Sequence, residues 1–325
     1  MQKTSPIQES KSSPYLVLFI SILSISTASL FIRYAQQEVP SMVIALYRMA
    51  IASLITACWL RSRHIQEFKR LACADWLKLT LSGLFLALHF AAWITSLEFT
   101  SVASSVVLVT TTPIWVALFS PWLLKEKITR QTFLFLGIAL LGGLLVTFAR
   151  ACHISGDQFV CSAFQSASGV DKILLGNLLA LFGAFMAAGY VMAGRLLRKS
   201  LSNISYTSIV YVVASLALLV LCLLFQQRIS GYSMAVFQWL FLLAVIPQLL
   251  GHSLINWALG RMPASMVSIA LLGEPVGSSF FAWLFLGEVP VWLEVVGGAL
   301  ILAGIALSMF ASKTKSQRRS SSSNF

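Results

Sequence analysis

Long apolar stretches without charged residues follow one another along the chain. Seven of them contain no Asp, Glu, Lys or Arg, namely 12–32, 79–97, 99–124, 131–149, 173–194, 200–227 and 229–260. Three more are nearly as apolar: 42–60 contains Arg48, 264–285 contains Glu274, and 291–310 has Glu294 near its start. A helix needs about 20 apolar residues to cross a bilayer. The pattern therefore predicts ten membrane-spanning helices, at 15–32, 42–60, 79–97, 102–124, 132–149, 173–194, 203–225, 234–259, 264–286 and 291–310.

The composition agrees with a multi-pass membrane protein. Of the 325 residues, 58% are hydrophobic and 10% are charged, against about 45–50% and about 25% in soluble domains. These values exclude an ordinary soluble enzyme and a disordered chain. The ends of the chain, 1–14 and 311–325, are polar and rich in Ser, so we expect disordered tails there. The first span resembles a signal peptide but is longer than a usual apolar core, which favours an uncleaved helix.

The net charge of +12 is a second unusual feature. In a soluble protein such an excess would suggest a nucleic-acid partner, but here the basic residues sort by loop. With ten spans, 18 Lys and Arg fall in the tails and the loops on their side, whereas 4 fall in the opposite loops. Cytoplasmic loops are the ones enriched in Lys and Arg. We therefore expect both termini in the cytoplasm of a cell (inner) membrane protein, and no nucleic-acid partner.

Two parts of the chain align without gaps at an offset of 162 residues, 102–146 with 264–308. Thr112-Pro113 falls on Glu274-Pro275, Glu126 on Glu288, and Gly142 on Gly304. Each half then holds five spans, and an odd number makes the two halves cross the membrane in opposite directions. Inverted repeats of this kind are typical of secondary transporters, whose substrate site lies near the midplane. The predicted fold is an all-α membrane protein with two inverted five-helix repeats, 15–149 and 173–310, around a central cavity, joined by an extracytoplasmic loop at 150–172.

Glu274 is the first candidate for transport. A carboxylate in the middle of a span is costly unless it is paired, hydrated or protonated, and Pro275 interrupts the helix beside it. Thr112 and Pro113 form a neutral counterpart in the other half, and interrupted helices in corresponding positions indicate a substrate site. The alternative is structural: Glu274 would bond to a neighbouring helix, and the two prolines would only shape the bundle.

Polar side chains recur at helical spacing on other spans. Gln248, His252 and Asn256 are spaced by four residues, and His89 and Trp93 share a face of another span. Such faces either line the cavity or bond between helices. Arg48 is the second formal charge inside a span, and three roles remain open: binding a substrate carboxylate, pairing with Glu274, or an architectural role that holds helix ends together.

The loop at 150–172 contains Cys152 and Cys161, which pair only if that side is oxidising and the geometry allows it. His153 is the one further ligand nearby, so no metal site is predicted. The chain contains no Walker-type loop and no H-E-x-x-H or G-x-S-x-G motif. We therefore expect no cofactor and no enzyme activity. A membrane-embedded enzyme and a channel are the alternatives of other classes. For the driving force two hypotheses stay open: proton coupling through Glu274 or His252, and simple exchange or facilitated diffusion.

Several segments carry a resemblance to a known family. They are Tyr47-Arg48, "TTPIW…LLKEKIT", and "LINWALGRMPASMVSIALLGEPV…FLGEVP…GGALILAGIAL". Over residues 15–310 the chain resembles the EamA-type drug/metabolite transporter superfamily. The resemblance implies ten helices around a central cavity, a monomer or homodimer in the bilayer, and exchange or export of small metabolites. We expect an amino acid or a related polar or amphipathic compound as substrate. The alternative is a nucleoside-type metabolite such as S-adenosylmethionine.

The charge distribution makes a direct prediction about topology. A reporter domain fused after Phe325 is expected to report a cytoplasmic position, because basic flanks are retained on that side. Activity of paired cytoplasmic and extracytoplasmic reporters in cells measures this. Fusions after Arg228, in a predicted outside loop, are the control and should give the opposite signal. An extracytoplasmic reading at Phe325 would contradict the predicted orientation.

Overall fold

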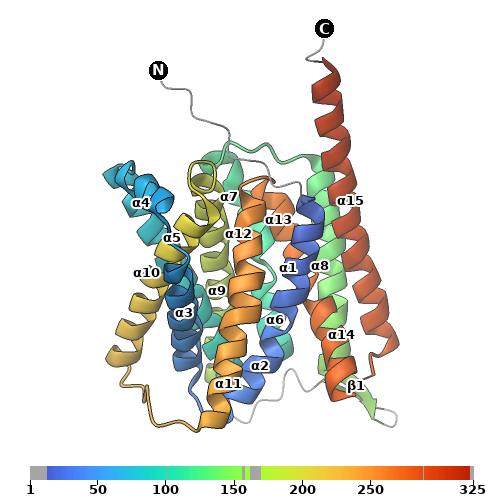
Figure 1. The fold of residues 1–325 in the computed structure, drawn as a ribbon. Coiled ribbons are helices and arrows are strands. Elements are labelled where there is room, and N and C mark those ends of the chain that lie inside the picture. The colour runs from blue at the N-terminus through green and yellow to red at the C-terminus, as the bar shows by residue number, and fades with distance from the viewer. Residues whose placement is uncertain (1–12, 101, 156–157, 162–169, 288, 323–325) are drawn as a thin grey trace.

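The computed structural model describes residues 13–100, 102–155, 158–161, 170–287 and 289–322. In this part the chain is helical except for one two-stranded antiparallel hairpin, β1–β2 (Figure 1). The elements are α1 (Pro14–Ser26), α2 (Ala28–Ala35), α3 (Ser41–Cys58), α4 (Ser62–Lys69), α5 (Cys73–Phe99), α6 (Val102–Val109), α7 (Thr112–Leu123), α8 (Arg130–Ala151), β1 (Cys152–Ser155), β2 (Gln158–Cys161), α9 (Val170–Leu197), α10 (Asn203–Leu224), α11 (Met234–Leu243), the π-helix η2 (Ala244–His252), α12 (Ser253–Leu259), α13 (Ala264–Leu271), α14 (Glu274–Leu286) and α15 (Trp292–Ser322).

Eight helical segments in the described residues are long and apolar enough to cross a membrane. They are Pro14–Ala35, Ser41–Cys58, Cys73–Phe99, Lys172–Leu197, Asn203–Leu224, Met234–Leu259, Ala264–Phe285 and Trp292–Ala311. The predicted spans at 102–124 and 132–149 correspond to shorter apolar helices, Thr112–Leu123 with α6 before it, and Arg130–Val146. The expected count of ten spans is therefore not confirmed, although the all-helical fold is.

The two faces of the bundle are marked by different parts of the chain (Figure 1). The terminal face is the one where α1 begins and α15 ends, and α4, α7 and α13 also approach it. The hairpin face is the opposite one, where β1 and β2 lie with α2 and α11. These two names do not depend on which face meets the cytoplasm.

One local expectation needs correction. The segment 311–325 was expected to be disordered, but the backbone of α15 continues through it as far as Ser322. Lys, Gln and Arg, which follow the apolar stretch, are good helix formers and let the helix propagate. The tail 1–14 lies almost wholly outside the described residues. The loop 150–172 contains the hairpin, in which the backbones of Cys152 and Cys161 face each other. Their side chains are not among those described, so the disulfide stays a prediction.

Glycines allow α8 and α15 to pack with their backbones in contact. A Cβ atom on Gly142 would lie 2.5 Å from the carbonyl oxygen of Gly297 and 2.8 Å from the backbone nitrogen of Ile301. A Cβ atom on Gly304 would lie equally close to the other helix, 2.8 Å from the oxygen of Phe135 and 3.0 Å from the nitrogen of Ala139. The two sets of contacts are related by the repeat offset. Adding 162 to Gly142 gives Gly304, and subtracting 162 from Gly297 and Ile301 gives Phe135 and Ala139. A two-fold axis that relates the two halves produces such reciprocal contacts.

The breaks in two helices follow the same relation. Turns interrupt the α-helix between α6 and α7 at 110–111 and between α13 and α14 at 272–273. Each break comes directly before the dipeptide that contains proline, Thr112-Pro113 in one half and Glu274-Pro275 in the other. Proline lacks an N–H group and disfavours helical geometry in the preceding residue. The aligned prolines therefore interrupt both helices at equivalent depths.

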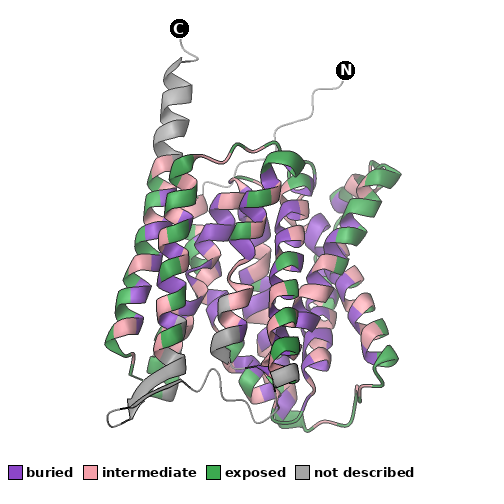
Figure 2. Cartoon of the chain, turned by 180° about the vertical axis from the view of Figure 1, so that it is seen from behind, coloured by how far each residue is buried: buried purple, intermediate pink, exposed green. Residues whose placement is uncertain are grey.

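Exposed residues lie along the outside of the bundle (Figure 2), and many of them are large and apolar. Leu54 on α3, Leu216 on α10 and Leu302 on α15 are each more than half exposed. A soluble protein rarely exposes apolar surface continuously over several helices, whereas lipid chains solvate such a surface without cost. The exposed belt is that of a protein surrounded by a bilayer.

The α8–α15 contact can be tested with one methyl group. Gly142→Ala is expected to lower the melting temperature of the detergent-solubilised protein, at a cost of about 1–3 kcal/mol, because the added Cβ meets backbone atoms that cannot move aside. Gly137→Ala is the matched control on the same helix, since nothing lies within 4 Å of a Cβ there. Fluorescence-detected thermal unfolding compares the two variants. Equal stability of both would contradict the close approach of the helices.

Candidate functional site

A cavity of about 400 Å³ lies between the two halves of the bundle. Its walls come from α1, α2, α3, α5, α6, α7, α8 and α9, and from η2, α12, α13 and α14. Both interrupted helices contribute at their breaks, through Thr112 and Pro113 in one half and Glu274 and Pro275 in the other. Arg33, in the last turn of α2, is exposed and also lines the cavity, and α2 lies at the hairpin face (Figure 1).

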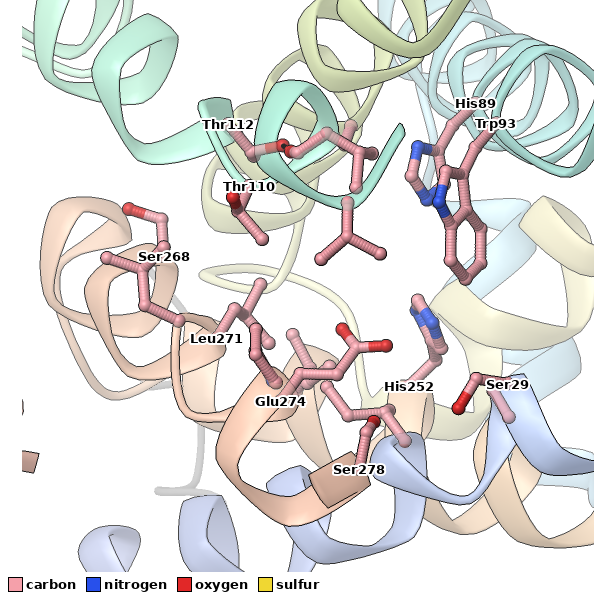
Figure 3. A pocket seen from close by; sticks show the side chains of 18 of the residues that line it. Ser29, His89, Trp93, Thr110, Thr112, His252, Ser268, Leu271, Glu274 and Ser278 are labelled. Atoms are coloured by element: carbon pink, nitrogen blue, oxygen red, sulfur yellow. Dashed lines mark hydrogen bonds between the residues drawn. The ribbon is translucent and has the colours of Figure 1, made fainter. Parts of the chain in front are cut away.

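Most of the residues expected from the sequence line this cavity. They are Arg48, His89, Trp93, Thr112, His252 and Glu274, with Pro113 and Pro275. Figure 3 shows the Glu274 carboxylate pointing into the cavity, with His252 and Trp93 to one side and Thr110 and Thr112 above. Side chains that are far apart in the sequence thus meet around one enclosed space.

Arg48 is buried, with 1% of its surface exposed, in the middle of α3. Its Nε donates a hydrogen bond to Oε1 of Gln248 at 2.8 Å, and its guanidinium carbon lies 4.1 Å from the ring centre of Phe90. No ion pair within 4.0 Å joins Arg48 to Glu274, although both line the cavity. Arg48 is therefore held by a neutral amide and an aromatic face, and its charge is not cancelled by direct contact with an acid.

The polar face of the eighth predicted span is divided between the cavity and the helices behind it. Gln248 holds Arg48, and Asn256 donates from Nδ2 to the hydroxyl of Tyr190 at 2.6 Å. His252 lies between them and lines the cavity. Gln248 and His252 belong to the π-helix η2, which contains Pro247, and Asn256 follows in α12. Wider π turns often occur at functional sites, and here they place Gln248 against Arg48 and His252 at the cavity wall.

His89 and Trp93 form a stacked pair on the α5 wall. Their ring centres are 5.9 Å apart and their planes differ by 8°. The Nδ1 atom of His89 and the carbonyl oxygen of Gly183 on α9 are 2.9 Å apart, which fixes the imidazole ring. Nε1 of Trp93 has no hydrogen-bond partner among the described residues. Together the two rings form a flat aromatic part of the cavity wall.

Three buried nitrogen atoms around the cavity have no hydrogen-bond partner among the described residues. They are Nη1 of Arg48, Nε1 of Trp93 and Nδ1 of His252. The first two are obligate donors. The Glu274 carboxylate likewise receives no hydrogen bond or ion pair within 4.0 Å from any described side chain. Leaving a buried donor unpaired costs about 1–3 kcal/mol, and these atoms belong to side chains that line the cavity.

Other wall residues were not expected from the sequence. Phe90 and Tyr190 both line the cavity, where Phe90 covers Arg48 and Tyr190 bonds to Asn256. Ser29 also contributes, whereas Ser278 shares the expected polar face of Glu274. Aromatic residues and serines are so common in apolar spans that neither type stands out in the sequence. Spacing from His89 indicates a shared face for Trp93 but places Phe90 one position aside, on a face that reaches Arg48 only in three dimensions.

Comparisons with known proteins agree with this architecture. One curated relative is named "Pseudopaline exporter CntI" and comes from Pseudomonas aeruginosa; it is 26% identical over 298 residues, covering 91% of this chain and 96% of that protein. Another is an uncharacterized transporter from Archaeoglobus fulgidus, 21% identical over 91% of this chain and 97% of that protein.

A solved crystal structure matches the fold with a TM-score of 0.73 at 19% sequence identity, over 94% of this chain and 99% of the other. The model of the EamA-like transporter family matches twice, at residues 12–148 and 174–310. The two matches cover the two halves related by the two-fold contacts. The chain belongs to the EamA-like transporter family of multi-pass membrane proteins.

Proposed function

We propose that the protein is a secondary carrier for a small metabolite that bears both an amino and a carboxylate group, an amino acid or a related amphipathic compound. Transport would occur by alternating access to the cavity between the two halves. The observation that carries this proposal is the cavity between the halves, whose wall includes both Arg48, with an unpaired Nη1, and Glu274, whose carboxylate forms no ion pair with a described residue.

Opposite charges on the cavity wall favour a zwitterion. Nη1 of Arg48 and Nε1 of Trp93 are donors suited to a substrate carboxylate. The Glu274 carboxylate is suited to an ammonium group. A zwitterion that reaches both satisfies the orphaned donors and adds no net charge to the bundle, whereas a simple anion or cation would leave one wall charge uncompensated.

The rest of the wall suits an apolar or aromatic side chain. Val106, Val109 and Leu271 contribute apolar surface, and Trp93 and His89 contribute a stacked aromatic face. Ligand sites commonly combine such walls with a few polar groups that fix orientation. We therefore favour amphipathic amino acids and their derivatives over small polar ones.

Driving force and direction belong to the same proposal. The relative named as an exporter supports movement out of the cell. Glu274 and His252 both line the cavity and both exchange protons, so either serves proton coupling, while exchange of one substrate for another needs neither. Binding of S-adenosylmethionine is the alternative substrate hypothesis, because it also carries an amino acid head group.

A ligand panel tests the proposed substrate class. The purified protein is expected to be stabilised by amphipathic amino acids, by about 2.7 kcal/mol at a concentration 100 times the Kd. Matched decarboxylated amines and deaminated acids should stabilise it less, because each leaves one wall charge unpaired. Glu274→Gln should abolish the preference for the amino acid over its deaminated analogue. Thermal unfolding in detergent and counterflow in proteoliposomes are the measurements.

Three results from these measurements would contradict parts of the proposal. Stabilisation by S-adenosylmethionine alone would favour the alternative substrate. Equal response to the zwitterion and to its deaminated analogue would exclude the role of Glu274 in amine binding. Substrate flux that does not saturate would indicate a channel.

A pair of tryptophans isolates the contribution of one donor. Trp93→Phe keeps an aromatic ring but removes Nε1, and should weaken binding by about 10- to 150-fold, since a hydrogen bond to a charged group contributes roughly 1.5–3 kcal/mol. Trp115→Phe is the matched control, because Nε1 of Trp115 is also buried and unpartnered among the described residues but lies outside the cavity wall. Isothermal titration with the best ligand of the panel measures both. Equal loss in the two variants would show a general packing effect.

A further inference from the structure

One carboxylate joins the two halves of the bundle at the terminal face. Glu126 follows α7 in the first half, and both of its oxygens accept hydrogen bonds from the second half. Nε of Arg195, at the end of α9, lies 2.6 Å from Oε1, and the backbone nitrogen of Ala264, at the start of α13, lies 3.0 Å from Oε2. Nη1 of Arg195 also donates to the carbonyl oxygen of Leu259 at 2.9 Å. The end of α7 is thereby tied to α9 and to the connection between α12 and α13.

The backbone before Glu126 adopts a conformation that side chains rarely take. Lys125 has a φ of 56°, in the left-handed region, and the backbone N–H of Glu126 donates to the carbonyl oxygen of Ser120 at 3.4 Å. This conformation costs roughly 1–2 kcal/mol for a residue other than glycine. Such backbone strain persists where surrounding contacts fix it. The contacts made by Glu126 are the ones that fix this turn.

The Glu126–Arg195 pair differs from the other ion pair among the described residues. Lys78 and Asp75 are three residues apart on one helix and are 50% and 35% exposed, so they connect nothing distant. Glu126 and Arg195 come from different halves and are 15% and 16% exposed. Partial burial reduces screening by water and salt, which makes the second pair the stronger connection.

The pair lies between the cavity and the terminal face. On α9 the cavity wall includes Ala187, Tyr190 and Val191 and does not reach Arg195. On α13 it includes Ser268, one helical turn beyond Ala264. The cavity wall thus ends before the elements that Glu126 holds together, and on α2, a helix that lies at the hairpin face, it includes Arg33.

The repeat relation supplies an independent comparison. The offset of 162 that interconverts the Gly142 and Gly304 contacts also places Arg195 on Arg33. Arg195 forms its ion pair beyond the cavity wall, on the side of the terminal face. Arg33 lines the cavity itself, is exposed, and makes no hydrogen bond or ion pair with any described residue. Glu288, which aligns with Glu126, lies outside the described residues, and nothing in the inference requires its position.

We infer that Glu126 and Arg195 are positioning residues for transport: their ion pair holds the cavity closed at the terminal face and breaks when the cavity opens there. This inference rests on the proposed alternating-access function, but it concerns the gate and not the substrate. Removing either charge should shift the population toward states in which the cavity is open to the terminal face, because the shift equals the stabilisation lost from the closed state.

The test measures from which face of the membrane a water-soluble reagent reaches the cavity. Ala187→Cys places a small thiol on the cavity wall, two helical turns before Arg195, in a background where the native cysteines are replaced. Right-side-out and inside-out vesicles are treated with a membrane-impermeant maleimide, and the labelling rate of the thiol is followed from each face. In the parent, labelling should be faster from the hairpin face.

Glu126→Gln and Arg195→Gln should each raise the labelling rate from the terminal face by about tenfold, the factor that corresponds to about 1.4 kcal/mol. The double variant should add little to either single change, because both remove the same interaction. Lys127→Gln is the matched control, since it removes an exposed charge next to Glu126. Unchanged labelling in both single variants, or the same rise in Lys127→Gln, would overturn the inference.

The melting temperature and the ratio of labelling rates from the two faces distinguish a gate from an ion pair that only stabilises the fold. A purely stabilising pair predicts that the variants melt at a lower temperature while the labelling ratio stays unchanged, and that result would also overturn the inference. The experiment needs no ligand, so it stands apart from the test of the substrate class. A failure of the amino acid panel combined with a shifted labelling ratio would reject the proposed substrate and keep the gate.

Discussion

Two opposite formal charges inside an apolar bundle are the constraint on which the site depends. Arg48 cannot be hydrated by lipid, so its guanidinium is held by Gln248 and covered by Phe90, which fixes α3 against η2 and α5. Glu274 meets no direct partner among the described side chains and faces the cavity. A bundle that buried both charges against each other would need no cavity, and keeping them apart leaves a polar space between the two halves.

The two-fold arrangement determines where that space lies. Gly142 and Gly304 bring α8 and α15 into backbone contact through matching sets of atoms. The α6–α7 and α13–α14 breaks occur at aligned prolines, so each half presents its interrupted helix at the same depth. Interrupted helices expose polar groups that need partners. Both sets of groups therefore face the space between the halves and not the lipid.

Much of this arrangement could be predicted from the sequence, because membrane spans need apolar length and repeats keep their spacing. Glu274 and His252 stand out since polar residues are rare in such spans, and both line the cavity. The π-helix η2 and the stacking of His89 on Trp93 could not be predicted, because they depend on which helices meet in space. The helical extension to Ser322 could not be predicted, because a polar, Ser-rich composition is typical of disordered tails.

The two halves share backbone contacts but not chemistry. The hydrogen bond between His89 and the carbonyl oxygen of Gly183 has a counterpart between Ser21 and the carbonyl oxygen of Gly251, each 2.9 Å long, in which the offset of 162 exchanges the two partners. By contrast, Glu274 is matched by Thr112. In the proposed mechanism the shared contacts and the unshared charges have different effects. The symmetric contacts give the two open states similar energies, while the asymmetric charges keep a bound zwitterion in one orientation as access alternates.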